Sequence, residues 1–281
     1  MPELPEVERG RRLAESVLVG RTIKGVKCAD DRIVYFGSTP QTVACRLRNR
    51  AVQAVRRKGK YIWFVLEKPP HPVFHFGMTG SFKVPGGSSI QLQSGPREDH
   101  STQHDWPPRF WKIHLTTDTG SELVMTNARR LGQIRLLNDP ENEPPISRLG
   151  FDPLLNLPPA AKMYEQLSRR KATIKGVLLD QSFAAGVGNW IADEILYQTK
   201  IAPTRRASDF SIDEVRAIRR RMKLIIEKAV AVNAEKKRYP RTWLFHHRWG
   251  ESSNARTAKG EPIQHITVAG RTTAWVPAVQ K

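Results

Sequence analysis

"KGVLLDQSFAAGVGNWIADEILYQ", residues 175–198, has helical character in both of its halves, with "GVGN" between them. Gly186 and Gly188 permit a tight turn there, because glycine adopts backbone conformations that other residues avoid. Asn189 would open the second helix, and the N–H groups exposed at such a helix start bind phosphate. Most turns of this kind are only connections. The stretch therefore predicts two helices joined by a tight turn, and it leaves open whether the turn also binds an anion.

The clearest helix of the chain follows at residues 211–232, "SIDEVRAIRRRMKLIIEKAVAV". Ser211 and Glu214 have the spacing of a capping box, and apolar residues recur every three or four positions after it. Arginines and lysines lie between the apolar positions, as is typical of a solvated helix face. Residues 243–281 lose this period and predict a short β appendage.

The N-terminal part predicts one helix followed by strands. Residues 3–18 form the helix, with Pro2 in its first turn and Glu3 and Glu6 at the positive end of its dipole. Short β-rich runs separated by Gly, Pro and Asp then predict an all-β sandwich. The runs are "TIKGVKCA", "RIVYFG", "AVQAVRRK", "KYIWFVLE", "PVFHFGM", "GSFKVP", "FWKIHLTT", "ELVMTN" and "GQIRLL".

Composition divides the rest of the chain. Residues 85–109 are polar and rich in Pro and Gly, which predicts a long flexible loop between strands. "NDPENEPP", at 138–145, is typical of a linker. We therefore expect a helix and sandwich at 1–137, a linker at 138–150, a helical domain at 151–242 and a terminal hairpin at 243–281.

The charge of the chain indicates a polyanionic partner. Its 46 Lys and Arg against 27 Asp and Glu give a formal net charge of +19 and a pI near 10.4. Nucleic acid fits this excess best, although a basic protein that only avoids other cations would also show it. The sequence has no membrane-length apolar run and no signal-peptide core, so we expect a soluble intracellular protein. Its two cysteines are too few for a thiolate zinc site or a disulfide framework.

The first residues could carry covalent chemistry. Removal of Met1 would leave Pro2 with a free secondary amine, and an α-amino group has a pKa of about 7.7 to 8.0. Such an amine can attack a sugar C1′ to form an iminium ion, with Glu3 as general acid and Glu6 as proton relay. The alternative is a plain helix start whose carboxylates complement the dipole.

Seven motifs, in this order and rough spacing, resemble the formamidopyrimidine-DNA glycosylase branch of the family that also contains endonuclease VIII. They are "MPELPEVE", "RRKGKY", "HFGMTGS", "ARRLG", "LGFDPL", "GVGNWIADEILYQ" and "AGRTT". Leu4 favours this branch, because endonuclease VIII relatives typically have Gly there. The resemblance implies an α+β protein of two domains: an N-terminal helix with an antiparallel β-sandwich, and a helix-two-turn-helix domain with a β-hairpin finger.

The resemblance also implies an activity. Such enzymes extrude an oxidised purine from duplex DNA, cut its glycosidic bond and nick the strand by β- and δ-elimination. The catalytic residues carried over by motif are Pro2 as nucleophile, Glu3 as acid, Glu6 as auxiliary proton carrier and Lys60 as phosphate contact. The DNA-binding residues are His75, Asn189 and Arg271 as phosphate clamp, Met78, Arg129 and Leu131 as wedge, and Lys175, with Glu194 at the lesion site.

The sequence departs from the family in several places. Val276 and Val279 stand where a cysteine pair would be, and "WGESSNARTAKGEP" lacks the other pair. The finger therefore resembles the zincless type of plants and fungi, held by apolar packing of Trp275, Val276 and Val279, and we expect neither metal nor cofactor. Leu131 replaces the usual Phe and Asn127 the common Asp, which affects base insertion and the preference for the opposite base.

The segment "NAEKKRYPRTW" does not resemble the bacterial loop that closes over 8-oxoguanine, so ring-opened or hydantoin lesions are the expected preference. Two alternatives remain: an endonuclease VIII-like enzyme for oxidised pyrimidines, and a non-catalytic protein that binds damaged DNA. The expected partner is double-stranded DNA that contains oxidised bases or abasic sites. We expect the protein to be a monomer and to have no membrane partner. Likeness to eukaryotic zincless members implies a nuclear location.

Overall fold

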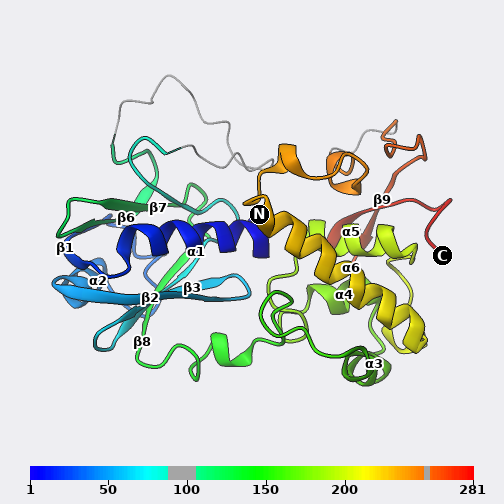
Figure 1. Ribbon diagram of the computed structural model, residues 1–281, viewed down its shortest axis with the longest axis horizontal. Helices are drawn as coiled ribbons and strands as arrows, with labels where there is room; N and C mark the ends of the chain where they lie inside the picture. Colours follow the sequence, from blue (N-terminus) through cyan, green and yellow to red (C-terminus); the bar gives the residue numbers. More distant parts are fainter. Residues whose placement is uncertain (88–105, 250–253) are drawn as a thin grey trace. The chain divides into compact units, whose positions relative to one another are not determined.

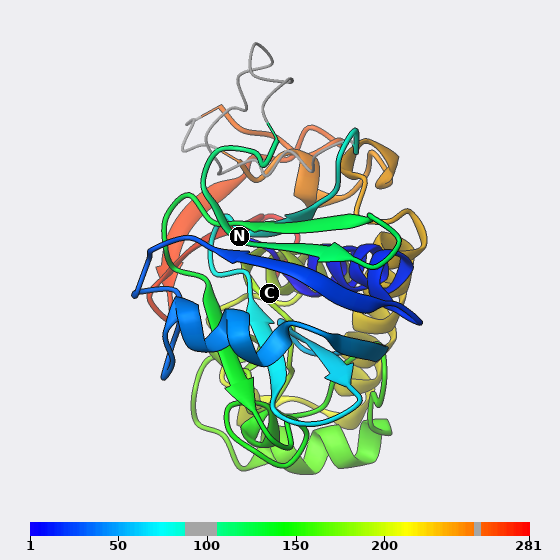
Figure 2. The ribbon, with the colours of Figure 1, turned by 90° about the vertical axis from the view of Figure 1, so that its left-hand side faces the viewer.

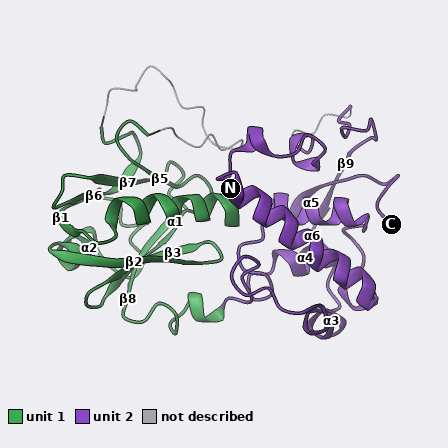
Figure 3. Ribbon diagram, viewed as in Figure 1, with its two compact units in different colours: residues 1–148 green, residues 149–281 purple. Residues whose placement is uncertain are grey.

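The structure is a computed structural model that describes residues 1–87, 106–249 and 254–281. It divides into two compact units, Met1–Arg148 and Leu149–Lys281 (Figure 3). This division lies inside the segment 138–150 that the sequence predicts as a linker. Most of the predicted flexible loop at 85–109 lies outside the described residues.

Unit 1 begins with a helix and continues mainly as strands (Figure 1). Its elements are α1 (Leu4–Leu18), β1 (Thr22–Cys28), α2 (Pro40–Leu47), β2 (Arg50–Lys58), β3 (Tyr61–Leu66), β4 (His71–His75), β5 (Ser81–Lys83), β6 (Trp111–Thr117), β7 (Glu122–Thr126), β8 (Gln133–Leu137) and the 3₁₀ helix η2 (Ile146–Arg148). The described strands pair in the order β5-β7-β6-β1-β2-β3-β4-β8, each antiparallel to its neighbour.

The sheet folds into a sandwich at the junction between β1 and β2. These strands pair only where each begins, at Thr22 with Ala51 and Ile23 with Arg50. The two layers of strands can be followed in Figure 2. Phe82 of one layer contacts the other layer, with ring centroids 5.8 Å from Phe64. Apolar side chains of both layers and of α1 form one core, which confirms the predicted helix and β-sandwich.

The segment "RIVYFG", predicted as a strand, forms turns instead. Val34 and Tyr35 are buried, and Tyr35 makes an isolated bridge with Ile134. The Val34 N–H donates locally to the Asp31 carbonyl at 3.2 Å. The Phe36 N–H and the Val34 carbonyl pair with Ile134 of β8, so the segment makes a single bridge and no regular ladder. The helix α2 after it was not predicted, although Thr39 caps it by accepting the Thr42 N–H.

Unit 2 is helical and ends in a hairpin. Its elements are α3 (Ala160–Ser168), α4 (Ile174–Leu179), α5 (Asn189–Thr199), η3 (Ala207–Asp209), α6 (Ile212–Ala231), η4 (Lys236–Arg238), η5 (Leu244–His246), β9 (Gln264–Val268) and β10 (Arg271–Trp275). The predicted helix pair is therefore α4 and α5, although α4 stops at Leu179 and the chain turns before Gly188 caps α5. The capping box of α6 is present, with Ser211 as N-cap and Glu214 as its partner.

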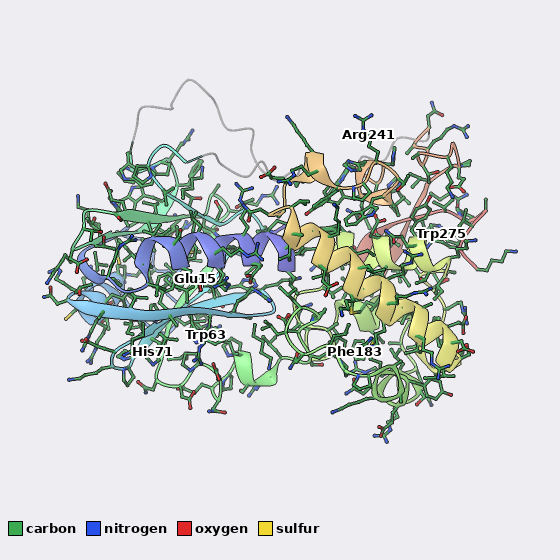
Figure 4. All side chains as sticks on the ribbon, in the orientation of Figure 1. Glu15, Trp63, His71, Phe183, Arg241 and Trp275 are labelled. Atoms are coloured by element: carbon green, nitrogen blue, oxygen red, sulfur yellow. The ribbon has the colours of Figure 1, made fainter. Side chains whose placement is uncertain are left out.

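The terminal hairpin packs through apolar side chains. Ala274 and Val276 are buried against Leu244 and Ile263, and Val279 packs against this cluster. Trp275, labelled in Figure 4, is only partly buried. Among the described residues, no group of three or more His, Cys, Asp or Glu could hold a metal ion. None of the described helices has the length and apolar composition of a membrane span.

Candidate functional site

The start of α1 buries the residues that the sequence connects with catalysis. Pro2 is buried, and Glu3 and Glu6 are 2% and 4% exposed. Glu3 is the N-cap of the helix, and its backbone N–H donates to the Glu6 carboxylate at 3.0 Å. Burying a carboxylate removes its hydration, which is unfavourable unless partners replace the water. One buried carboxylate thus belongs to the residue next to the predicted nucleophile, and the second is hydrogen-bonded to the backbone of that residue.

Lys60 lies in the tight turn between β2 and β3, and a buried ion pair fastens this turn to α1. The Arg57 Nε donates to Glu8 at 2.9 Å, and the Arg57 Nη1 donates to the Gly59 carbonyl at 3.0 Å. Burial alone would raise the pKa of Glu8, but the hydrogen bonds and charges of Arg57 and Arg11 lower it below its usual value. Glu8 and Arg57 were not predicted as site residues. The sequence signal for this pair would have been an acidic residue, Glu8, on the apolar face of a predicted helix, where it needs a buried cationic partner.

His75 lies at the end of β4 beside the turn that carries Lys60. It is paired in register with Tyr61, and the two ring centroids are 4.7 Å apart. Burial and the nearby charges of Lys60 and Arg135 lower the pKa of His75 to about 4. The Nδ1 atom accepts the Gly77 N–H at 3.2 Å, so the proton of the neutral ring is on Nε2. His75 therefore offers a neutral N–H donor near neutral pH.

Two loops of unit 1 are locked together and carry the predicted wedge residues. Gly77 has φ +60°, and a Cβ there would lie 2.4 Å from the carbonyl group of Leu131. The Asn127 side chain, fully buried, donates to the Phe76 carbonyl at 2.9 Å. Because these contacts fix the backbone on both sides, the partly exposed Met78 and the 57%-exposed Leu131 project from a rigid base.

Arg129 is exposed, and its neighbour Arg130 anchors the same loop. Arg130 adopts φ +56° and binds Asp31 through both Nε and Nη2, the latter at 3.0 Å. Lys112 donates to the same carboxylate at 2.7 Å. Asp31 is buried, so its two cationic partners make the attachment strong. Both arginines of "ARRLG" are exposed, but Arg130 anchors the loop through Asp31, which the motif alone did not indicate.

In unit 2, Asn189 and Arg271 are brought together by the hairpin. Asn189 is the first residue of α5, and its Nδ2 donates to the Thr272 carbonyl at 2.9 Å. Arg271 is exposed and opens β10 directly after the turn at Ala269 and Gly270. A helix start with an arginine next to it is a suitable binding site for one phosphate.

Lys175 and Glu194 are both fully buried, whereas the other residues predicted to contact DNA are at least partly exposed. Lys175 is 0% exposed, and its Nζ donates to Asp193 at 2.6 Å. A buried and ion-paired ammonium is not available to a DNA phosphate, so we assign Lys175 a structural role. Glu194 is also fully buried, and it accepts the Phe245 N–H at 2.8 Å and the Gln198 amide at 2.7 Å. Burial raises the pKa of Glu194 to about 7, and its lesion-site role stays a prediction.

Known sequence families match both units. The formamidopyrimidine-DNA glycosylase N-terminal domain matches residues 1–134, and the formamidopyrimidine-DNA glycosylase H2TH domain matches residues 149–240. A formamidopyrimidine-DNA glycosylase of Arabidopsis thaliana is 41% identical over 281 residues, which cover 100% of this chain and 71% of the relative. Its counterpart in Geobacillus kaustophilus (strain HTA426) is 30% identical over 291 residues and 100% of both chains.

A solved structure has the same fold. The crystal structure of Lactococcus lactis formamidopyrimidine-DNA glycosylase, bound non-covalently to DNA containing an AP site, matches with a TM-score of 0.79. The match covers 99% of each chain at 24% sequence identity. The predicted fold class and family resemblance are therefore confirmed. Because the matched domains span most of the chain and the relatives are similar over its whole length, the chain belongs to the formamidopyrimidine-DNA glycosylase family.

Proposed function

We propose that this protein is a DNA glycosylase and AP lyase of base excision repair that acts through the amine of Pro2. The nitrogen bonds to the sugar C1′ as the glycosidic bond breaks, and the freed base leaves with a proton. The C1′–O4′ bond then breaks and O4′ takes a proton, which gives an open-chain iminium ion that acidifies the C2′–H. Loss of that proton expels the 3′ phosphate, and a second elimination expels the 5′ phosphate. Water then hydrolyses the sugar fragment from the amine.

One observation carries this proposal. Pro2 is adjacent to Glu3, and both Glu3 and Glu6 are buried carboxylates at the first turn of α1 in a chain of this family. Glu3 is adjacent to the nucleophile and suits the acid that assists opening of the sugar ring, and Glu6 suits a proton carrier. An ordinary helix start gains nothing from burying two carboxylates, because surface caps do the same work without desolvation.

The DNA contacts follow from charge and exposure. Lys60 and the neutral N–H of His75 suit phosphates, whereas Met78, Arg129 and Leu131 suit the gap left by an extruded nucleotide. Asn189 and Arg271 of unit 2 suit a further phosphate. The net charge of +19 favours the polyanion throughout. The Lactococcus relative, whose structure contains DNA with an AP site, supports this class of partner.

The finger is proposed to be zincless, and the substrate to be an oxidised purine. The apolar packing of Val276 and Val279 and the lack of a metal-binding group among the described residues support the first proposal. The name shared by the relatives supports the second, and the altered segment at 233–243 favours ring-opened or hydantoin lesions. A nuclear location is proposed from the likeness to plant and fungal members.

Borohydride trapping on a duplex with an abasic site tests the mechanism. We expect a covalent adduct with the protein lacking Met1, and no adduct with an N-terminal tag that blocks the amine. Pro2→Gly replaces the secondary amine by a primary amine that still forms an imine, so it should give less adduct rather than none. Pro5→Gly is the matched control, because it changes a buried proline of the same turn and leaves the amine intact. An adduct that persists when the N-terminal amine is blocked would place the nucleophile elsewhere. Tight binding without any adduct would favour the non-catalytic alternative.

Substrate class is tested by single-turnover cleavage of duplexes with formamidopyrimidine, hydantoin, 8-oxoguanine or thymine glycol. We expect the ring-opened purine and the hydantoin to be cut fastest. Preference for thymine glycol would favour the endonuclease VIII-like alternative. Activity that survives prolonged chelation is expected for a zincless finger, and loss of activity restored by zinc would contradict it.

A further inference from the structure

Asp193 forms a buried polar junction in unit 2. It lies on α5 one turn after Asn189 and is 1% exposed. Its Oδ1 accepts from Lys175 Nζ at 2.6 Å, and its Oδ2 accepts from Arg248 Nη2 at 2.6 Å. The Oδ2 atom also accepts the backbone N–H of Ala274 at 3.1 Å. One carboxylate thus joins α4, the segment after η5 and strand β10.

The partners of Asp193 make the junction strongly dependent on its charge. Lys175 and Arg248 are 0% and 7% exposed, so neither cation is solvated by bulk water. Removing the carboxylate would leave two buried cations close together, whereas removing Arg248 would leave a neutral pair of Asp193 and Lys175. A buried charge without its partner is strongly destabilising, and a retained neutral pair much less so.

The junction continues into the residues predicted to bind phosphate. Lys175 Nζ donates to Thr273 Oγ1 at 2.6 Å and lies 3.5 Å from the Thr272 carbonyl. Thr273 Oγ1 in turn donates to the Arg271 carbonyl at 3.1 Å. Asn189 donates to the same Thr272 carbonyl at 2.9 Å. The backbone of residues 271–274 is therefore held at successive positions.

We propose that Asp193 is a positioning residue that fixes the hairpin against α5, so that Asn189 and Arg271 are held ready for one DNA phosphate. Asp193 has no contact with DNA in this role, and it acts through Lys175, Thr272 and Thr273. This inference rests on the proposed function for its ligand. The fixing of the hairpin itself does not depend on DNA.

The salt dependence of binding to a duplex with an uncleavable tetrahydrofuran abasic-site analogue tests the proposal. Losing one phosphate contact lowers the slope of log K against log salt by about 0.9. We expect Arg271→Ala to show this and to weaken binding roughly 10- to 100-fold. Asp193→Asn should show the same fall in slope and a similar loss. Simple electrostatics predicts the opposite, because removing a negative charge should strengthen binding to DNA.

The double variant Asp193→Asn/Arg271→Ala should bind no more weakly than Arg271→Ala, since residues that act through one contact are not additive. Glu165→Gln is the matched control, because its pair with Arg169 is exposed, and it should leave binding and slope almost unchanged. Unchanged slope in a folded Asp193→Asn, or a loss that adds to that of Arg271→Ala, would overturn the proposal. Should Asp193→Asn not fold, Arg248→Met must show a smaller change in the same direction, and an unchanged slope would overturn it.

Hydrogen exchange of the free protein separates this proposal from the proposed function. The amides of residues 268–275 should lose protection in Asp193→Asn or Arg248→Met, while those of α6 keep theirs. Undiminished hairpin protection would overturn the positioning role. A wild-type protein that shows this behaviour yet fails to bind or trap the abasic duplex would contradict the proposed function alone.

Discussion

The helices α1 and α6 begin with the same reciprocal cap, built from different residues in different surroundings. In α6, the exposed Ser211 accepts the Glu214 N–H at 3.3 Å, and Glu214 accepts the Ser211 N–H at 2.8 Å. Serine is among the preferred N-cap residues. In α1 the N-cap is Glu3, which is not among them, and Glu6 accepts its N–H.

The difference concerns burial. The α6 cap is at the surface, and the adjacent pair of Asp213 and Arg216 is 81% and 63% exposed. The α1 cap is buried, and so is the pair of Glu8 with Arg57 that follows it. A surface cap serves the helix at little cost, whereas buried carboxylates are unfavourable unless something compensates. Of the three buried carboxylates at the start of α1, Glu8 is paired with Arg57, and the proposed chemistry would account for the burial of the other two.

The largest expected effect is on activity. Glu3→Ser gives α1 a preferred N-cap, so we expect its unfolding free energy to stay the same or rise. Nicking of an abasic duplex should fall at least about 100-fold, because a positioned general acid contributes about 10²- to 10⁴-fold. Single-turnover nicking and urea unfolding of the same sample measure both quantities. Wild-type nicking by Glu3→Ser would mean that the α1 start is only a cap.

The second effect is on stability. Glu8→Gln leaves Arg57 buried without its charge partner, and breaking such a pair destabilises by about 3 to 5 kcal/mol. Urea unfolding should show this loss, and the double variant Glu8→Gln/Arg57→Met should recover much of it. Asp213→Asn is the matched control in α6, where an exposed pair contributes at most about 0.5 kcal/mol. Equal losses in both helices would contradict the comparison.

The third effect is on the fall of the unfolding free energy at low pH, which we call the acid limb. The pKa of Glu8 is lowered by Arg57 and Arg11 against the effect of burial, and that of Glu214 is lowered first by Arg205. A carboxylate whose folded pKa is lowered stabilises the protein above its unfolded pKa of about 4.3, and this contribution is lost as pH falls through the folded pKa. We expect Glu8→Gln to flatten the acid limb below about pH 4.3 more than Glu214→Gln does.

His75 makes stability depend on pH over a separate and wider pH range, and both variants retain this dependence. Its folded pKa of about 4 lies below the ordinary value of 6.5, so the unfolded chain binds more protons between these values and stability falls as pH drops. Unfolding curves from pH 7 to pH 3 in wild type and both variants measure the two windows. An acid limb that is the same in all three proteins would exclude a contribution from Glu8.

The two helices also show why some features could be predicted from sequence. The bounds of α1 and α6 follow from local signals, namely a cap, dipole-matched carboxylates and an apolar period. The turn at 32–37 could not be found in this way, because its composition is that of a strand while its backbone forms turns and pairs with β8 at one bridge only. Whether β-rich residues join a ladder depends on available neighbouring edges rather than on propensity.

The site shows the same limit. The motifs identified Arg129 and Arg271, and both side chains are exposed. Their exposure does not require specific contacts with distant residues. The burial of Lys175 depends on Asp193 and on Thr273, which lies 98 residues away in sequence. A single sequence does not distinguish a lysine that has such buried partners from one that is exposed to solvent. The structure therefore adds the distant polar contacts that decide which charges are structural.

The smallest expected effect lies in α6. It tests whether the surface cap of α6 affects stability alone, in contrast to the buried start of α1. Ser211→Ala removes the acceptor of the Glu214 N–H, which should lower the unfolding free energy by about 0.5 to 2 kcal/mol. Nicking by the folded variant should equal that of wild type, because a surface cap holds no group that reacts. Ser211→Asp should restore the lost stability, since aspartate caps as well as serine. Reduced nicking in a fully folded Ser211→Ala would mean that both helix starts contribute to the reaction, and burial would then not be what distinguishes them.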